Sequence, residues 1–314
     1  MQAIYCELRD KCDFEIIVID NHCPELQTQL EKKGVLRDKG GDYMKLLATA
    51  ERPWLKYATY DQKLSHWNAK NSGVMASDGE FLWFVDSHCV PSQGSLIRMF
   101  DYYKASHELL HGTLHMPLSY MLEQPGLELI YKLVTDPEHG VVGYAFTRYK
   151  EKKCWSYEVP CMSTCGMMMS RKIYDALGGW PSGMGIYGGG EHFVNFALAV
   201  MGYSINIFTA QPLYHYAAPR GYHYNYLDYH RNRTIATYMF GGKKWAYKYI
   251  MGIKPHDKSA DSHKEAIYAS IVGNELCMEQ RLHIKSQQTK TICAWLKEQD
   301  IILPDDMIDH TPVE

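Results

Sequence analysis

The chain has 314 residues, of which 46% are hydrophobic and 22% are charged, and its formal net charge is −3. These values are ordinary for a globular protein with one large domain, or one domain and an appendage. The small net charge excludes a general attraction to nucleic acid or anionic membranes, and no apolar run reaches the roughly 18 residues of a membrane-spanning helix. Nine scattered cysteines without a zinc-binding spacing, and no recognisable secretory signal, favour the cytoplasm.

The first half of the chain alternates predicted helices and strands. Apolar residues at helical spacing predict the helices, and short apolar runs predict the strands. We expect helices at residues 1–11, 24–33, 62–76 and 92–104, strands at 14–20 and 80–85, and irregular structure at 34–60.

The second half remains mixed until about residue 242 and then becomes helical. We expect extended segments at 111–118, 161–169 and 204–209, helices at 127–134, 171–177 and 192–201, and a loop-rich insertion at 135–160. Beyond residue 243, the segments 263–284 and 289–299 have amphipathic helical periodicity. The sequence therefore predicts an α/β domain at 1–242 and a helical C-terminal extension at 243–314.

The apolar strand 81–85 ends in a polar pair. Asp86 and His88 stand two residues apart, so their side chains point the same way from an extended backbone. A carboxylate and an imidazole can share one divalent cation, and ligands of open α/β sheets bind at the carboxyl ends of strands. The alternative is a strand that simply stops at a polar turn.

A run of three glycines precedes a second polar pair. Gly188, Gly189 and Gly190 allow close approach to the backbone and place Glu191 and His192 at a helix N-terminus. Glu191 is either a functional carboxylate or one that the helix dipole stabilises. His192 is a residue type that can act as a general base near neutral pH.

Four segments of the chain form a series. They are Phe14–Asn21, the stretch from Ala69 to Glu80 with its Lys-Asn and Asp-Gly-Glu motifs, the Asp-Ser-His-Cys run ending at Cys89, and the block Gly178–Phe193. In this order and spacing they resemble GT-A glycosyltransferases, especially the family 2 group and the polypeptide N-acetylgalactosaminyltransferases. The resemblance implies a mixed, mostly parallel Rossmann-like sheet flanked by helices, and transfer of a sugar from a nucleoside diphosphate sugar, UDP-linked, to an acceptor hydroxyl.

The resemblance also implies a metal site. Members of this superfamily hold a divalent ion on the donor diphosphate, here with Asp86 and His88 as ligands. A third ligand is expected at His215, which follows the last core strand. Oxygen and imidazole ligands favour Mn²⁺, with Mg²⁺ as the alternative.

The donor itself is expected to contact five further residues. Asp20 ends the first predicted strand, where the family has an Asp on the nucleotide base; the alternative is an Asp that caps a turn. Lys70 and Asn71 stand where the family usually has Arg-Asn, so Lys70 would bind phosphate as a point charge. Arg220 and Tyr222, in a glycine-containing stretch, would fold over the diphosphate as a lid.

The catalytic pair departs from the family pattern. Inverting members have an acidic base where His192 stands, and the retaining N-acetylgalactosaminyltransferases have Asn, so inverting and retaining transfer both remain open. Two other functions remain open as well: a catalytically inactive sugar-nucleotide-binding protein, and a nucleotidyltransferase. The acceptor would be a glycan, a lipid-linked sugar, a protein or a modified nucleic-acid base.

The start of the chain is also unusual for the family. Members open with a strand before the first helix, whereas residues 1–11 here read directly as that helix. Either the sequence is truncated or another segment replaces the first strand.

Overall fold

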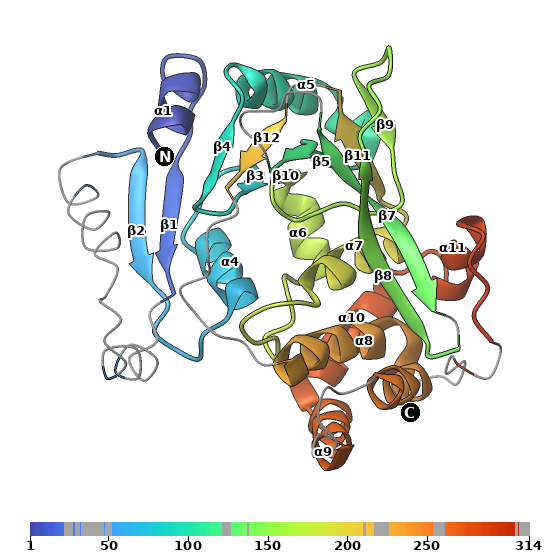
Figure 1. Ribbon diagram of the computed structural model, residues 1–314. Helices are drawn as coiled ribbons and strands as arrows, with labels where there is room; N and C mark the ends of the chain where they lie inside the picture. Colours follow the sequence, from blue (N-terminus) through green and yellow to red (C-terminus); the bar gives the residue numbers. More distant parts are fainter. Residues whose placement is uncertain are drawn as a thin grey trace.

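The computed structural model describes residues 1–21, 52–120, 127–136, 138–209, 212–216, 226–253 and 261–304, with a few isolated residues between and after these ranges. The described strands form three sheets, and helices pack around them (Figure 1). The helix predicted at 24–33 lies outside the described residues.

The first sheet is a parallel pair of β1 (Ile16–Asp20) and β2 (Leu55–Thr59), which Figure 1 shows at the edge of the molecule. The prediction of irregular structure was wrong for β2, because its pairing with β1 stabilises a run that has little apolar character of its own. Helix α1 (Gln2–Leu8) precedes β1. Among the described residues no strand precedes α1, and β1 pairs only with β2.

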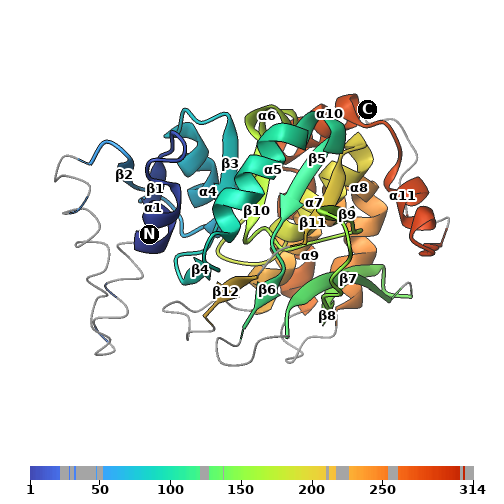
Figure 2. The same ribbon diagram turned by 90° about the horizontal axis from the view of Figure 1, so that it is seen from above.

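The second sheet forms the centre of the fold. Its strand order is β3 (Phe81–Phe84), β10 (Met167–Ser170), β5 (Gly112–His115), β11 (Ser204–Phe208) and β9 (Ser156–Glu158). All four residues of β5 and of β10 are buried, which matches the continuous apolar pattern of strands covered on both faces. Helix α5 (Ser95–Leu110) lies against β5, β10 and β11 (Figure 2).

The third sheet joins the segments that carry the predicted metal ligands. Its strand order is β4 (Cys89–Pro91), β12 (Leu213–His215), β6 (Leu118–Ser119), β7 (Leu129–Asp136) and β8 (Val141–Arg148). The helix predicted at 127–134 is wrong, because this segment is β7 and pairs antiparallel with β8 over its full length. The pairing partner overrides the local helical pattern.

The mixed α/β fold is confirmed, but the described sheets are less parallel than predicted. β1–β2, β5–β11 and β6–β12 are parallel pairs. The other described pairs are antiparallel, including both neighbours of β10. The sequence pattern indicates that a strand is buried but not in which direction it runs. The proportion of parallel to antiparallel pairs therefore could not be predicted.

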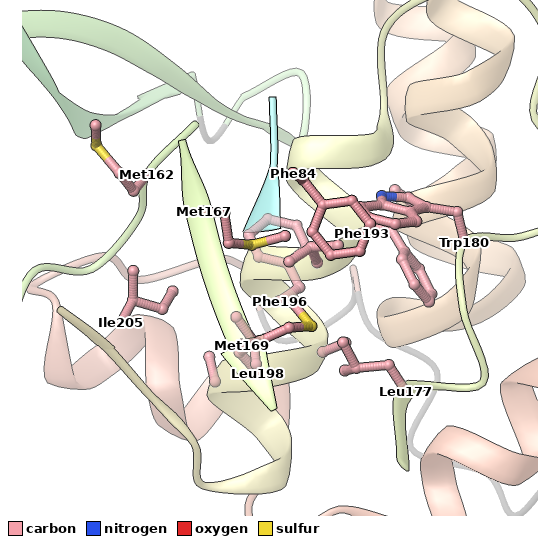
Figure 3. Packing of buried hydrophobic residues seen from close by; sticks show 14 of the residues in the cluster. Phe84, Met162, Met167, Met169, Leu177, Trp180, Phe193, Phe196, Leu198 and Ile205 are labelled. Atoms are coloured by element: carbon pink, nitrogen blue, oxygen red, sulfur yellow. The ribbon is translucent and has the colours of Figure 1, made fainter. Parts of the chain in front are cut away.

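One hydrophobic core connects the second sheet to the helices below it. Helices α6 (Arg171–Leu177) and α7 (Gly190–Met201) pack on this sheet and on each other. Figure 3 shows Phe84 pointing at Trp180, and their ring centroids lie 5.0 Å apart in an edge-to-face arrangement. The methionines Met167 and Met169 fill the space between the strand and α7, as flexible thioethers commonly do.

The C-terminal part is helical. Helix α8 (Tyr226–Gly252) is followed by α9 (Asp261–Val272), α10 (Glu275–Gln287) and α11 (Ile292–Glu298), so residues 263–284 form two helices instead of one. Gly242 interrupts α8 with non-helical dihedral angles at the predicted boundary between residues 242 and 243. Ile284 and Trp295 nevertheless belong to the same core as the sheet. The division into two domains remains a prediction.

Mild acid should destabilise the fold through the buried His115. Its Nδ1 donates to the Ser163 carbonyl, its Nε2 accepts from Thr113, and burial lowers its pKa to about 4. As the pH falls below the ordinary histidine pKa of about 6.5, the unfolded chain binds a proton that the folded chain cannot, so stability is lost down to about pH 4. Between pH 7 and pH 5 this histidine should lower the free energy of unfolding by about 2 kcal/mol.

Urea titrations at the two pH values measure this loss. In His115→Gln, which keeps hydrogen-bonding capacity without titrating, the difference between the two pH values should be smaller by about that amount. An unchanged difference would show that His115 does not couple protonation to folding.

Candidate active site

Strand pairing brings the turn after β3 to the end of β12. β4 and β12 are antiparallel in a register that sets Cys89 opposite His215, and the Tyr216 N–H donates to the His88 carbonyl at 3.0 Å. His215 therefore lies next to residues 86–88, although more than a hundred residues separate them in sequence. The three predicted metal ligands are brought together.

His215 connects the other two ligands. Its Nε2 lies 3.7 Å from Asp86 Oδ2 and 3.1 Å from His88 Nε2. Asp86 Oδ1 and His215 Nδ1 are both buried, and neither makes a hydrogen bond within the described part of the chain. One carboxylate and two imidazoles are ligand types that suit Mn²⁺. The atoms that face one another are Asp86 Oδ2 and the Nε2 atoms of the two histidines, so these residue types fit the predicted ion.

Positive groups on α4 (His66–Met75) surround the same carboxylate. Lys70 Nζ and His66 Nε2 each lie 3.6 Å from Asp86 Oδ1. Burial acts to raise the pKa of Asp86, but Lys70, His215, His66 and His88 together hold that pKa well below its ordinary value. Asp86 is therefore ionised near neutral pH, as a metal ligand must be.

The side chain of Lys70 is mostly buried. Its Nζ is buried without a hydrogen bond and lies about 6 Å from the ring centroids of Trp67, Phe84 and Trp180. The predicted phosphate contact of Lys70 is compatible with this geometry.

The sequence analysis missed His66. This residue stands four positions before Lys70, and residues at this spacing share one face of a helix. Ser65 caps the helix by accepting from the Asn68 N–H at 3.2 Å, which fixes where α4 begins and hence which face carries the two positive groups. This spacing alone would have placed His66 on the same helix face as Lys70.

All these groups line one cleft of about 2490 Å³ between β1 and β3, which also contains Glu191 and Thr164. Thr164 Oγ1 donates to Glu191 Oε1 at 3.5 Å. Burial raises the pKa of Glu191, although Lys70 opposes the shift. Glu191 is thus a partly buried carboxylate in the same cleft as Asp86.

The structure does not bring His192 to the cleft. Its ring is 7% exposed, packs 4.3 Å from the Tyr144 ring, and accepts a hydrogen bond at Nε2 from Arg233 Nη2 at 2.8 Å. Burial, and then the Arg233 charge, hold its pKa well below the ordinary value. The guanidinium occupies Nε2 and burial disfavours protonation of the ring, so this geometry does not support the role of base predicted for His192.

The three glycines are explained by packing within the protein. A Cβ on Gly188 would meet the Tyr229 ring, and a Cβ on Gly190 would meet the indole of Trp67. Gly189 lies against the Asn232 backbone and has a φ of +77°, which favours glycine. The groups that approach these glycines closely are therefore parts of the chain itself.

The remaining predicted residues have mixed outcomes. Asp20 Oδ2 accepts from the Tyr57 hydroxyl at 2.6 Å, and its neighbour Asn21 lines the cleft; contact of Asp20 with a base stays a prediction. Asn71 accepts at Oδ1 from the Trp180 N–H and donates at Nδ2 to the Trp180 carbonyl. Asn71 therefore braces the loop at 178–180, and its predicted contact with the donor stays a prediction. Arg220 and Tyr222 lie outside the described residues.

Comparison with known proteins identifies the class. The profile of the glycosyl transferase family 2 matches residues 3–178. The fold is similar to that of GalNAc-T7, in a crystal structure with UDP, GalNAc and Mn²⁺, with a TM-score of 0.62 and 14% identity over 90% of this chain and 50% of that one. Staphylococcus aureus TarS 1–349 in complex with UDP-GlcNAc gives a TM-score of 0.46 and 14% identity, over 95% of this chain and 72% of that one.

The fold is that of the GT-A glycosyltransferases, as the sequence predicts. The chain belongs to glycosyl transferase family 2. It spans half the length of the GalNAc-T7 chain. A search of curated proteins finds no significant match. No helix in the described ranges has the length and apolarity needed to cross a membrane.

A stability measurement tests the buried role of His192. His192→Ala should remove one hydrogen-bond acceptor of the buried Arg233 guanidinium, which also bonds to Tyr249, and lower the free energy of unfolding by about 1–3 kcal/mol. Urea denaturation measures the loss. His263→Ala, which removes an exposed imidazole, is the matched control and should change little. Equal stability of His192→Ala and wild type would contradict the role.

Proposed function

We propose that this protein is a metal-dependent glycosyltransferase that moves a sugar from a UDP-linked donor to an acceptor hydroxyl. The observation that carries the proposal is the cluster of Asp86, His88 and His215, in which Asp86 and His215 are partly buried and His88 is exposed. Family membership supports the reaction class, and the GT-A relative crystallised with UDP and Mn²⁺ supports the donor and the ion.

The chemistry requires charge neutralisation at the leaving group. The bond between the sugar C1 and the diphosphate oxygen breaks, and its electron pair stays on the diphosphate. A new bond forms between C1 and the acceptor oxygen, whose proton goes to a base. A divalent ion, Mn²⁺ or alternatively Mg²⁺, would supply Lewis-acid stabilisation of the departing diphosphate. Asp86, His88 and His215 are the residues that would hold it.

Two residues of this chain have further roles in the proposal. Lys70 would bind a phosphate oxygen, because its ammonium is buried in the cleft without a hydrogen-bond acceptor. Glu191 would bind the acceptor hydroxyl and take its proton, directly or through water. Burial raises the pKa of this carboxyl group, which makes its ionised form a stronger base than an exposed carboxylate.

The cellular location is also part of the proposal. The eight cysteines that the structure describes are all free, which supports a reducing compartment, the cytoplasm. Cell fractionation with an antibody to the protein tests this location.

Donor binding should require both the metal and Asp86. Calorimetric titration of UDP should show binding in the presence of Mn²⁺ and none in a chelator. Asp86→Asn removes the ligand charge and should abolish the Mn²⁺-dependent part. Asp78→Asn is the matched control, since this carboxylate is 95% exposed. Equal UDP binding with and without Mn²⁺ would rule out a metal-dependent donor site.

Transfer should depend on Glu191. A panel of nucleotide sugars, tested with glycan, lipid-linked, protein and nucleic-acid acceptors, identifies the substrate pair. With that pair, Glu191→Gln should lower turnover by roughly 10²–10⁴-fold while UDP binding is retained. Glu158→Gln, at an exposed position on β9, is the control.

The outcomes separate the alternatives. Donor binding without transfer or donor hydrolysis in any combination would favour an inactive binding protein. Release of pyrophosphate from a nucleoside triphosphate and a sugar phosphate would identify a nucleotidyltransferase. The anomeric configuration of the product distinguishes inverting from retaining transfer.

A further inference from the structure

We infer that two buried cysteines beneath the proposed Mn²⁺ ligands form a thiolate site for a soft, tetrahedral ion of the Zn²⁺ type. The sulfur atoms of Cys89 and Cys165 lie 3.4 Å apart, and both residues are buried. His215 is within reach of both sulfurs. The possible ligand atoms of His88, Cys89 and His215 all lie within 4.8 Å of one another, as do those of Asp86, Cys165 and His215.

The separation of the two sulfurs is close to the one that zinc requires. With Zn–S bonds of about 2.3 Å and tetrahedral angles, two thiolate sulfurs bound to one ion lie about 3.8 Å apart. With Zn–N bonds of about 2.0 Å, a sulfur and an imidazole nitrogen lie about 3.5 Å apart. The sulfur–sulfur distance is within a few tenths of an ångström of the value for two thiolates, whereas His215 has a ring nitrogen within 4.8 Å of each sulfur in two separate groups, so the imidazole must turn to complete the site. Either His88 or Asp86 would supply the fourth ligand.

The backbone around the two cysteines is already fixed. Cys89 begins β4, its N–H donates to the Asp86 carbonyl at 3.1 Å, and its register opposite His215 is set by the β4–β12 pair. The Cys165 N–H donates to Ser163 Oγ at 3.1 Å, and the next N–H donates to the Phe84 carbonyl at 2.8 Å. Little ordering is therefore needed on binding. Both cysteines line the same cleft as Asp86, which gives the ion access.

Ligand softness separates the two metals. Mn²⁺ and Mg²⁺ prefer carboxylate, imidazole and phosphate oxygens, whereas thiolates select Zn²⁺ and similar ions. Zinc binding would displace the two thiol protons to solvent, so the Zn²⁺–dithiolate unit is neutral. A thiol pair that merely packs in the core would instead make a weak S–H···S contact and bind no metal.

Because both sites need His215, the protein cannot bind Zn²⁺ at the thiolate site and Mn²⁺ at the proposed donor site at the same time. A zinc ion bound to Cys89, Cys165 and His215 takes the imidazole that the proposed Mn²⁺ site needs. This inhibitory consequence rests on the proposed function, whereas the thiolate site itself does not. Zn²⁺ would then act as an antagonist of Mn²⁺ at a centre built from overlapping ligands.

Cobalt is the probe that reports thiolate ligation directly. The metal-free protein, reduced with a phosphine that carries no thiol, is titrated with Co²⁺. We expect a thiolate-to-cobalt charge-transfer band in the near ultraviolet and intense visible bands of tetrahedral Co²⁺. Cys89→Ser and Cys165→Ser should each lose the charge-transfer intensity of one sulfur and weaken Zn²⁺ binding by at least about tenfold.

Controls keep the result interpretable. Cys161→Ser removes a buried thiol outside the cluster and should retain the wild-type cobalt spectrum. Near-ultraviolet circular dichroism of each variant establishes that it is folded. Absence of the bands in wild type, or their persistence in the double variant Cys89→Ser/Cys165→Ser, would overturn the inference.

The test distinguishes this inference from the proposed function. UDP binding that depends on Mn²⁺, combined with no thiolate bands, refutes only the zinc site. Thiolate bands with no Mn²⁺-dependent UDP binding refute only the proposed function. If both hold, equimolar Zn²⁺ should abolish Mn²⁺-dependent UDP binding in wild type and in Cys161→Ser; retention of binding would refute the sharing of His215.

Discussion

The centre of this structure depends on keeping one buried carboxylate ionised. Removing Asp86 from water is unfavourable, and only nearby positive charge offsets the cost. That charge comes from Lys70 on α4, and the imidazoles of His66 and His215 lie beside the same carboxylate. The helix, the strand pair and the turn after β3 must therefore all be in place for the site to exist. Fold and site are coupled through this single charge.

The local part of this arrangement is readable from sequence. An apolar run that ends in Asp86 and His88 specifies a buried strand and a polar turn, and the structure has β3 and the turn in those places. The contribution of His215 is different. It depends on the register between β4 and β12, which joins residues more than a hundred positions apart, and only the family resemblance indicated it. Likewise β2 and β7 are stabilised by distant partners that local patterns do not reveal.

The pair of Glu191 and His192 shows a second limit. Consecutive residues of a helix point about 100° apart, so when one faces a cleft the other faces elsewhere. The sequence placed both at a helix N-terminus but could not orient the helix about its axis. Packing decides the orientation of the helix. His192 contacts Tyr144 and Arg233, and Glu191 contacts Thr164 in the cleft. A motif match therefore predicts the sequence position of a functional residue more reliably than the direction of its side chain.

The contact between Trp67 and the glycine run has an evolutionary consequence. The indole of Trp67 fills the space that a side chain at residue 190 would need, and its Nε1–H donates to the Gly188 carbonyl at 2.9 Å. The two positions are thus one steric unit: a larger residue at 190 is compatible only with a smaller one at 67. Because α4 carries Lys70 and α7 carries Glu191, any lineage that exchanges this pair also alters the spacing between the two sides of the cleft. A side chain at residue 190 alone would clash with the indole, so this position can change only after residue 67 has become smaller.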